Sequence, residues 1–596
     1  MPENQDEFHG LGKISASNLL RKLHRNAKSN IPALMAQRAM GTFSLQAEPP
    51  PHEASSIVFV VVYPQNPFVS EPEIRKMLAD DIQAGLINSR IQIISDTIPI
   101  AEPDEEGNYL YWKDTPQFDQ VSAIYYATLT LRMWERYAHR TIPWAFPHPR
   151  LLINPHIGEM ANAFYNEQER LLGFHNFKVR NGDTNSTAQS ADIVAHETAH
   201  AVLDGIRDLY NESFGLGARA FHESFGDITA MLIALHDDSL VRRMLEWTQG
   251  DLRMSNFVTE VAEHLTDELA NSEYLQEHTV YLRNAFNMLK SVPFDDMEYD
   301  VEAPLITLSR QEHNYSRLFT GAIYDIFAAV YERFLEKQPS NYVAIYRARD
   351  VIGQLVMLAV ELAPIGEMDF GDMARAMLTA DDIAYHGNYS DLIKSAFVER
   401  DILSDSDADA HLKSLKKLPD LDLPDTLNTA LSAAMYFEQV VRPTLDIDEE
   451  LLPVSTYRNA NGYTFMAYFS SRKMRLQGDQ YEEFKGADID VFGGLTLMWD
   501  ANSKLRSVVY RPVTDEDLRQ IGIIIADWVE NDKIANDLLP IEITIRPHPR
   551  GLHIPHEQLP EDTDRIIKYP VIFDDISETD TGFYEYLKTL QQQAST

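Results

Sequence analysis

The segment Asp192–Leu203 reads DIVAHETAHAVL and contains two histidines, His196 and His200, four positions apart. Apolar residues surround the polar ones at helical spacing, so the segment predicts a helix with both imidazoles on one face. Two imidazoles one turn apart can bind a single zinc ion, and Glu197 between them can then take a proton from a water on the metal. Two core-facing histidines satisfied by hydrogen bonds would show the same spacing, so the motif needs support from the rest of the chain.

Support comes from a second predicted helix, which contains Phe221–Ala230, FHESFGDITA. Glu223 can supply a third protein ligand, and three protein ligands leave the fourth position of a zinc ion open for water, as catalysis requires. Asp227 follows one turn later and is suited to accept a hydrogen bond from the far N–H of a ligand imidazole, which fixes the tautomer of that ring. If HExxH were absent, both acids would indicate a solvated helix face.

The amino-acid composition limits the chemistry of this site. The 596 residues include no cysteine, which excludes disulfides, thiol catalysis and cysteine-ligated zinc or iron–sulfur clusters. Any metal must therefore bind to histidine or carboxylate side chains. With 44% hydrophobic and 24% charged residues, the chain has enough apolar material for folded cores, and its length predicts several domains.

Charge and hydropathy indicate which partners to expect. The chain has 91 acidic and 52 basic side chains, a net charge of −39, and such a surface suits neither phosphate backbones nor anionic membranes. We therefore expect no nucleic-acid partner. No run of about 18 apolar residues occurs, so we expect no membrane span. The first residues lack the apolar stretch of a signal peptide, which predicts a cytoplasmic protein, with a non-standard export route as the alternative. The sequence does not indicate an oligomeric state.

Five consecutive regions are predicted from changes in composition and periodicity. A basic arm, without acidic residues between Phe8 and Ala47, is followed by a proline-rich linker and then by a small α/β module. A mainly helical central domain, a second linker rich in Asp and Lys, and a β-rich α+β module follow. The boundaries of the five regions are 1–53, 54–113, 114–404, 405–429 and 430–596.

The elements of these regions follow from hydrophobic periodicity and turn residues. In the small module we expect a buried strand at Ile57–Tyr63, a helix at Glu71–Ala84 and a strand at Arg90–Ile98, in a βαβ-like arrangement. In the last module, Asn461-Gly462 marks a hairpin turn. Further helices are predicted at Ser122–His139, Asn314–Lys337, Asn341–Leu362, Met368–Tyr385, Tyr389–Glu399 and Asp515–Asn531, and further strands at Leu151–Ile153, Tyr457–Asn459, Tyr463–Phe469, Gly493–Asp500, Leu505–Pro512 and Ile541–Arg546.

HExxH followed by a helical Glu-x-x-x-Asp resembles the gluzincin metallopeptidases, and specifically the thermolysin-like group. Further segments resemble motifs of that family, in the expected order, over residues 115–403. They are Ser122–Tyr126, which resembles the helix leading into an edge strand; Asn162–Tyr165, which resembles that strand; Tyr210–Ser213 and Glu312–Ser316, which resemble the segments of the active-site tyrosine and histidine; and Phe370–Asp381, which is similar to the closing helices.

The resemblance implies an α+β multidomain protein. A thermolysin-like catalytic domain, mostly helical in its second half, would lie between a small N-terminal α/β module and a β-rich C-terminal module. The implied activity is that of a zinc metalloendopeptidase, with His196, His200 and Glu223 as the zinc ligands. Asp192 occupies the position of a family calcium ligand, but Ala234 stands where a further carboxylate would be needed, so calcium binding is doubtful.

The resemblance also implies roles for residues around the metal. Glu197 would act as general base on the attacking water. His313 and Tyr210 would donate hydrogen bonds to the developing oxyanion. Asn162 and Ala163, on the edge strand, would hold a peptide or protein substrate by backbone pairing.

The sequence departs from the family pattern in several places. Twenty-two residues separate His200 from Glu223, a few more than is usual, which indicates a loop insertion. Residues 239–308 are largely a further insertion. His222 replaces the asparagine that commonly precedes the third ligand.

Two alternatives remain open. The chain could be a zinc-bearing but non-proteolytic binding protein, although a site that only binds has no need of Glu197. It could also be a gluzincin aminopeptidase, although the glycine-rich exopeptidase motif of that group has no counterpart in Leu151–Ser190.

Overall fold

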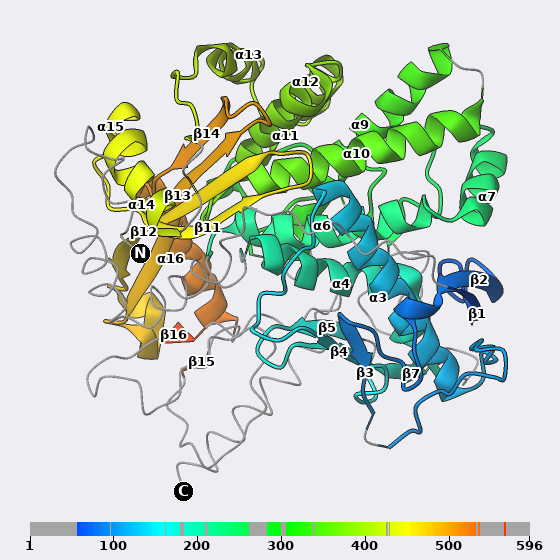
Figure 1. The fold of residues 1–596 in the computed structure, drawn as a ribbon. Coiled ribbons are helices and arrows are strands. Elements are labelled where there is room, and N and C mark those ends of the chain that lie inside the picture. Colours follow the sequence, from blue (N-terminus) through cyan, green and yellow to red (C-terminus); the bar gives the residue numbers. More distant parts are fainter. Residues whose placement is uncertain are drawn as a thin grey trace, which may run out of the picture.

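The computed structural model describes residues 56–95, 97–160, 162–178, 184–207, 209, 213–261, 283–299, 306–337, 340–424, 427, 430–531, 535–536 and 566–567. Helices and sheets in several domains make up this part of the chain, in agreement with the predicted α+β class (Figure 1). The predicted basic arm, the strand predicted at 541–546 and Tyr210 lie outside the described residues. Within those residues, no helix is long and apolar enough to cross a membrane.

The first described elements are two antiparallel strands, β1 (Ile57–Val62) and β2 (Glu73–Leu78). The helix predicted at 71–84 is therefore wrong, since only a short 3₁₀ turn follows β2. Pairing with β2 gives partners to the backbone groups of β1, and this non-local requirement outweighs the helical spacing of the apolar residues. Ile74, an apolar residue within the predicted helix, is 62% exposed in β2.

The third strand, β3 (Ile91–Ile93), does not complete a βαβ module with β1. It joins a four-stranded sheet of order β3-β4-β6-β5, with β4 (Leu151–Asn154), β6 (Leu171–Phe174) and β5 (Ala163–Asn166). β3, β4 and β6 are parallel, whereas β5 is antiparallel to β6 and forms an edge of the sheet. Strands from both sides of the predicted boundary at residue 113 thus share one sheet.

The helices form successive layers on this sheet (Figure 1). Helix α4 (Ala191–Ile206) packs on β5 and on α6 (Leu216–Ala234), which packs on α9 (Glu312–Lys337), and α9 packs on α10 (Asn341–Leu362). The predicted helices of the central domain are confirmed, although the first, α3, begins six residues earlier than expected, at Pro116. The remaining helices and short strand pairs are α3 (Pro116–Ala138), α7 (Asp238–Thr248), α11 (Phe370–Tyr385), α12 (Ser390–Glu399), β7 (Asn176–Lys178) with β8 (Thr184–Ser186), β9 (Glu260–Val261) with β10 (Arg283–Asn284), and β15 (Ala535–Asn536) with β16 (Ile566–Ile567).

Polar caps set the start of two later helices. Asp369 and Asp372 form a reciprocal capping box at the start of α11. Ser404 accepts a hydrogen bond from Asp407 N at the start of α13 (Asp405–Ser414), in which Ala408 is buried. The segment 405–429, predicted as a linker, is therefore helical in its first part. A capped start and a buried apolar contact outweigh its charged composition.

The C-terminal module is an antiparallel sheet with one long helix. Its strands, β11 to β14, lie in sequence order, and Gly462, at φ 80°, forms the predicted hairpin turn between the first two. The predicted strands and helix of the described part are confirmed; the first three strands are longer than expected, and the fourth ends one residue earlier. Their bounds are α14 (Ala430–Tyr436), α15 (Arg442–Thr444), β11 (Leu452–Arg458), β12 (Thr464–Arg475), β13 (Asp488–Trp499), β14 (Leu505–Arg511) and α16 (Asp515–Glu530).

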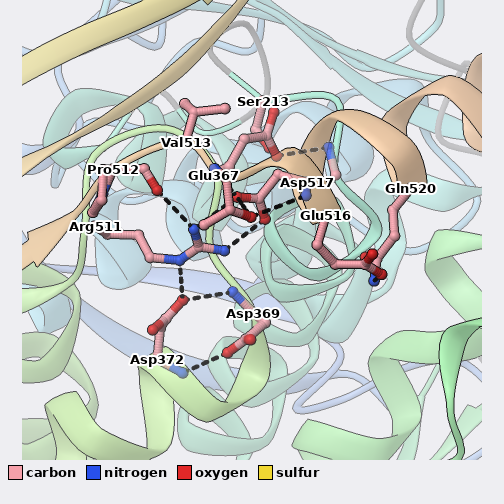
Figure 2. A network of polar contacts seen from close by, with 12 residues as sticks. Ser213, Glu367, Asp369, Asp372, Arg511, Pro512, Val513, Glu516, Asp517 and Gln520 are labelled. Carbon is pink, nitrogen blue, oxygen red and sulfur yellow. Dashed lines mark hydrogen bonds and ion pairs between the residues drawn. The ribbon is translucent and has the colours of Figure 1, made fainter.

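Glu367 links the start of α6 to this module (Figure 2). Its carboxylate accepts hydrogen bonds from Ser213 Oγ at 2.6 Å, Phe214 N at 2.7 Å and Gly215 N at 2.8 Å. The backbone N–H of Glu367 donates to Phe492 O on β13. The helix that carries Glu223 therefore begins at a point fixed by the C-terminal sheet.

Arg511 on β14 makes a second link between the two parts. It donates to Asp372 of α11 and, through two nitrogens, to Asp517 of α16 (Figure 2). Phe214 and Leu216 extend the contact with apolar surface, because they lie in one buried cluster with side chains of β13 and α16. The C-terminal module and the helical domain thus share both polar bridges and a core.

Candidate metal centre

Helices α4 and α6 bring three potential metal ligands to one buried place. His196 and His200 lie one turn apart on α4, with ring centroids 4.6 Å apart and planes at 87°. Glu223 of α6 faces both rings: its Oε2 lies 3.3 Å from His196 Nε2, and its Oε1 lies 3.8 Å from His200 Nε2. All three side chains are buried.

These spacings suit ligands that share one ion. Donor atoms at about 2.0–2.1 Å from a tetrahedral zinc ion lie about 3.3 Å from one another. Glu223 Oε1 is buried and accepts no hydrogen bond from the described residues. Burial of a carboxylate oxygen destabilises the folded state unless a cation or a water molecule binds that oxygen. The residues present therefore fit a divalent metal.

Glu197 lies beside these ligands. It is buried, and its carboxylate and the ring nitrogens of His196 and His200 form a group whose potential ligand atoms all lie within 4.8 Å of one another. A carboxylate in this position can accept and return a proton.

Asp227 lies beside Nδ1 of His196, the ring nitrogen that does not face Glu223. Its Oδ1 lies 3.2 Å from His196 Nδ1, which is the contact expected from the sequence. Arg283 of β10 donates to the same carboxylate, from Nε to Oδ2 at 3.0 Å and from Nη2 to Oδ1 at 2.8 Å. Burial raises the pKa of Asp227, but the charge of Arg283 and the contact with His196 outweigh burial and lower that pKa to about 2. An ionised carboxylate at this distance favours a hydrogen on His196 Nδ1, which would leave Nε2 for a metal.

The same contacts act on the protonation of His196. Burial lowers the pKa of this ring, but the hydrogen bonds and charges of Asp227 and Glu223 raise it to about 10. A metal ion that binds His196 therefore has to displace a proton. Sequence reasoning missed Arg283, because a single arginine in a predicted insertion gives no signal of its partner.

His200 is supported by a second histidine. His222 Nδ1 lies 2.6 Å from His200 Nδ1, and His222 Nε2 lies 2.8 Å from Asp204 Oδ1, with all three side chains buried. If His200 binds a metal through Nε2, its Nδ1 carries the hydrogen and donates to His222, which then donates from Nε2 to Asp204. Both imidazoles thus face a carboxylate on their Nδ1 side. Asp227 lies beside His196 directly, and Asp204 is linked to His200 through His222.

His200, His222 and Glu223 also form a second group of potential ligand atoms. However, the 2.6 Å between the two Nδ1 atoms is a hydrogen-bond distance, shorter than the roughly 3.3 Å between two nitrogens on one tetrahedral ion. His222 is therefore placed as a hydrogen-bond partner of His200 and not as a second ligand of one ion. Sequence reasoning noted His222 only as a departure and missed Asp204, although its position one turn after His200 was an available signal.

Replacing Asp204 by asparagine is expected to weaken zinc binding by about 10- to 100-fold, because the charge that stabilises the His222–His200 pair is removed. Competition with a chelator measures the affinity. Asp350→Asn, which changes an acid with a half-exposed side chain, is the matched control. An unchanged zinc affinity in Asp204→Asn would contradict the role of this carboxylate.

His313, in the first turn of α9, faces the same site. Its Nε2 lies 3.3 Å from Glu223 Oε2. Gln311 Oε1 accepts the Asn314 N–H at 2.6 Å, which turns Gln311 Nε2 toward His313 Nδ1 at 2.7 Å. Because an amide nitrogen only donates, His313 Nδ1 accepts and the ring hydrogen is on Nε2. His313 therefore directs its Nε2–H toward the site.

Asn162 and Ala163 lie where the edge strand β5 begins. Asn162 is buried, its Oδ1 accepts from Ala163 N at 2.7 Å, and its backbone oxygen accepts from His175 N at 3.2 Å. Its Nδ2 is buried and donates to no described residue. Because Tyr210 lies outside the described residues, its role stays a prediction.

Gly226 of α6 lies against the ring of His196. A Cβ atom there would lie 2.5 Å from His196 Cε1 and Nδ1, far inside contact distance. Gly226→Ala is therefore expected to displace this imidazole and to lower zinc affinity at least about tenfold. Zinc content after dialysis against a chelator measures the effect. Gly371→Ala, whose Cβ would meet nothing closer than 3.0 Å, is the matched control. Full zinc retention in Gly226→Ala would show that the ring has room to move.

Neither a family model nor a curated protein matches this chain.

Proposed function

We propose that this chain is a zinc-dependent metalloendopeptidase of the thermolysin-like, gluzincin kind. The observation that carries the proposal is the buried convergence of His196, His200 and Glu223, with Glu197 beside them. Two imidazoles and one carboxylate form a known ligand set of catalytic zinc, which keeps one position open. Zinc is also the metal that a thiolate-free site of this kind commonly binds.

The residues around the site have complementary tasks in peptide hydrolysis. When bound, zinc supplies Lewis acidity, which polarises the scissile carbonyl and acidifies the attacking water. Glu197 accepts the proton of that water and later delivers it to the leaving nitrogen, so it must be ionised at rest. His313 donates from Nε2 to the oxygen that becomes negative, and Tyr210 is the second proposed donor.

The proposed substrate is a peptide in extended conformation along β5. An edge strand offers backbone groups to such a peptide and tolerates many side chains. Asn162 Nδ2 is a buried donor without a partner among the described residues, which suits a carbonyl oxygen of the substrate. Asn162 would thus fix the position of the chain that β5 pairs with.

Metal analysis combined with a protease assay tests the proposal. We expect about one zinc per chain, and cleavage of casein that a chelator abolishes and added zinc restores. An aminopeptidase would act on substrates with a free amino terminus and leave casein essentially intact. A zinc-containing protein that cleaves neither would favour the binding-protein alternative, and freshly purified protein without zinc would reject the proposed site.

A further inference from the structure

The last described helix, α16, reaches the segment that leads into His313. Arg310 donates to Asp527 of α16 through two nitrogens, from Nε to Oδ2 at 2.7 Å and from Nη2 to Oδ1 at 3.1 Å. A bidentate pair between a guanidinium and a carboxylate fixes orientation as well as distance. The backbone three residues before His313 is therefore tied to the C-terminal module.

A second contact reaches the residue adjacent to His313. The guanidinium of Arg219, on α6, lies over the ring of Trp528, with Cζ 4.7 Å from the ring centroid. Arg219 Nη2 donates to Glu312 Oε1 at 2.7 Å. Arg219 and Glu312 are each 2% exposed and Trp528 is 4% exposed. Buried charges have little freedom to reorient, because loss of either partner leaves an uncompensated charge.

The electrostatics of Glu312 agree with this arrangement. Burial raises the pKa of this carboxyl, but the charge and the hydrogen bond of Arg219 outweigh burial and lower it to about 2. The carboxylate is therefore ionised and held against Arg219, whose guanidinium lies over the indole of Trp528.

Between these two contacts lies Gln311. Its side chain donates to His313 Nδ1 at 2.7 Å and so places the ring hydrogen on Nε2. Of its two neighbours in the chain, Arg310 contacts α16 directly and Glu312 is linked to α16 through Arg219. A shift of this backbone would move the Gln311 amide away from the imidazole of His313. The ring hydrogen would then no longer be held on Nε2.

We propose that helix α16 of the C-terminal module positions His313, with Asp527 acting through Arg310 and Trp528 acting through Arg219 and Glu312. The catalytic consequence of this coupling rests on the proposed peptidase function. Asp527 and Trp528 are positioning residues, since neither touches the metal ligands. The C-terminal module thus forms a structural part of the active site.

The tautomer of His313 tests the coupling without reference to activity. In full-length protein with ¹⁵N-labelled histidine rings, His313→Phe identifies the His313 signals. Wild type is expected to show one Nε2–H tautomer, and Trp528→Ala a mixture or a shifted signal. Trp528→Phe keeps an aromatic face for Arg219 and is expected to restore the wild-type signal. Asp515→Asn, at the start of the same helix and paired with Arg472, is the control. A His313 spectrum unchanged by Trp528→Ala would overturn the proposal.

Kinetics provide the second measurement. A small misplacement of a catalytic group costs on the order of tenfold to hundredfold in rate, so Trp528→Ala is expected to lower kcat by about that factor, with KM and zinc content retained. In a His313→Phe background the same change is expected to lower kcat less than about twofold, because the affected residue is gone. Equal losses in both backgrounds would indicate general destabilisation and would overturn the proposal.

Misfolding of a variant and failure of the proposed function can both be told apart from failure of the coupling. If Trp528→Ala does not fold, Asp527→Asn takes its place in both measurements, since it removes only a partly exposed ion pair. If the protein has zinc but no peptidase activity, the proposed function fails, while the His313 tautomer still decides whether α16 positions this ring.

Discussion

Glu197→Gln protein is expected to hydrolyse peptides about 10²- to 10⁴-fold more slowly than wild type, which is the usual contribution of a general base. Glutamine has nearly the shape of glutamate but cannot take a proton from water at neutral pH. His196, His200 and Glu223 are untouched, so zinc content is expected to stay at the wild-type level. Steady-state kcat on a blocked peptide, with metal analysis of the same samples, measures both quantities.

The control for this change is Glu332→Gln, which alters an acid on α9 whose side chain is half exposed. It is expected to leave both kcat and zinc content unchanged. Zinc-loaded Glu197→Gln protein that cleaves as fast as wild type would exclude Glu197 as the base. Loss of zinc together with activity would instead make Glu197 a ligand, an outcome that its place in the His196–His200 group allows.

The second large effect is expected for His313→Phe. Its Nε2 faces the site and carries the ring hydrogen, and removing one donor to a developing oxyanion costs about 10²- to 10³-fold in kcat, or roughly 3–4 kcal/mol. The change is expected to act on kcat with little effect on KM, because the hydrogen bond strengthens only in the transition state. Zinc content is expected to be retained.

His313→Gln separates the loss of a donor from the loss of a ring. Its amide keeps an N–H near the position of Nε2, so a partial recovery of kcat relative to His313→Phe is expected. If both variants retain wild-type kinetics, His313 makes only local contacts at the start of α9, and the oxyanion must be stabilised by other groups.

The central part of the site follows from local spacing. His196, Glu197 and His200 share one helix face because of the 3.6-residue period, and Glu223 and Asp227 share another for the same reason. That the two faces meet was proposed from the residue types and was also implied by the family resemblance, and the structure brings Glu223 Oε2 within 3.3 Å of His196 Nε2. Helical periodicity alone does not specify which helices pack together.

The supporting residues depend on packing between distant segments and were not predictable. Arg283 lies 56 positions from Asp227, and its contact depends on the placement of β10. Gly226 has no side chain to suggest a role, yet the missing Cβ makes room for the His196 ring. Asp204 is the exception, because its spacing from His200 is local.

In the fold, too, elements set by local periodicity were predicted, and elements set by contacts between distant segments were not. Long amphipathic helices such as α9 and α10 were predicted within a few residues, since their apolar faces repeat over many turns. The segment 73–78 was assigned to a helix but pairs with β1, and β3 joins a sheet across the expected domain boundary. Strand pairing is non-local, so short segments take the structure that their partners impose.

The core shared by Phe214, Leu216 and helix α16 has a consequence for biosynthesis. Chains emerge from the ribosome from the N-terminus, and domains generally fold as units when complete. The start of α6, which carries Glu223, lacks part of its packing until the chain has been made as far as Val529. We therefore expect the group of potential metal ligands around Glu223 to take its final arrangement only after residue 529 has been made.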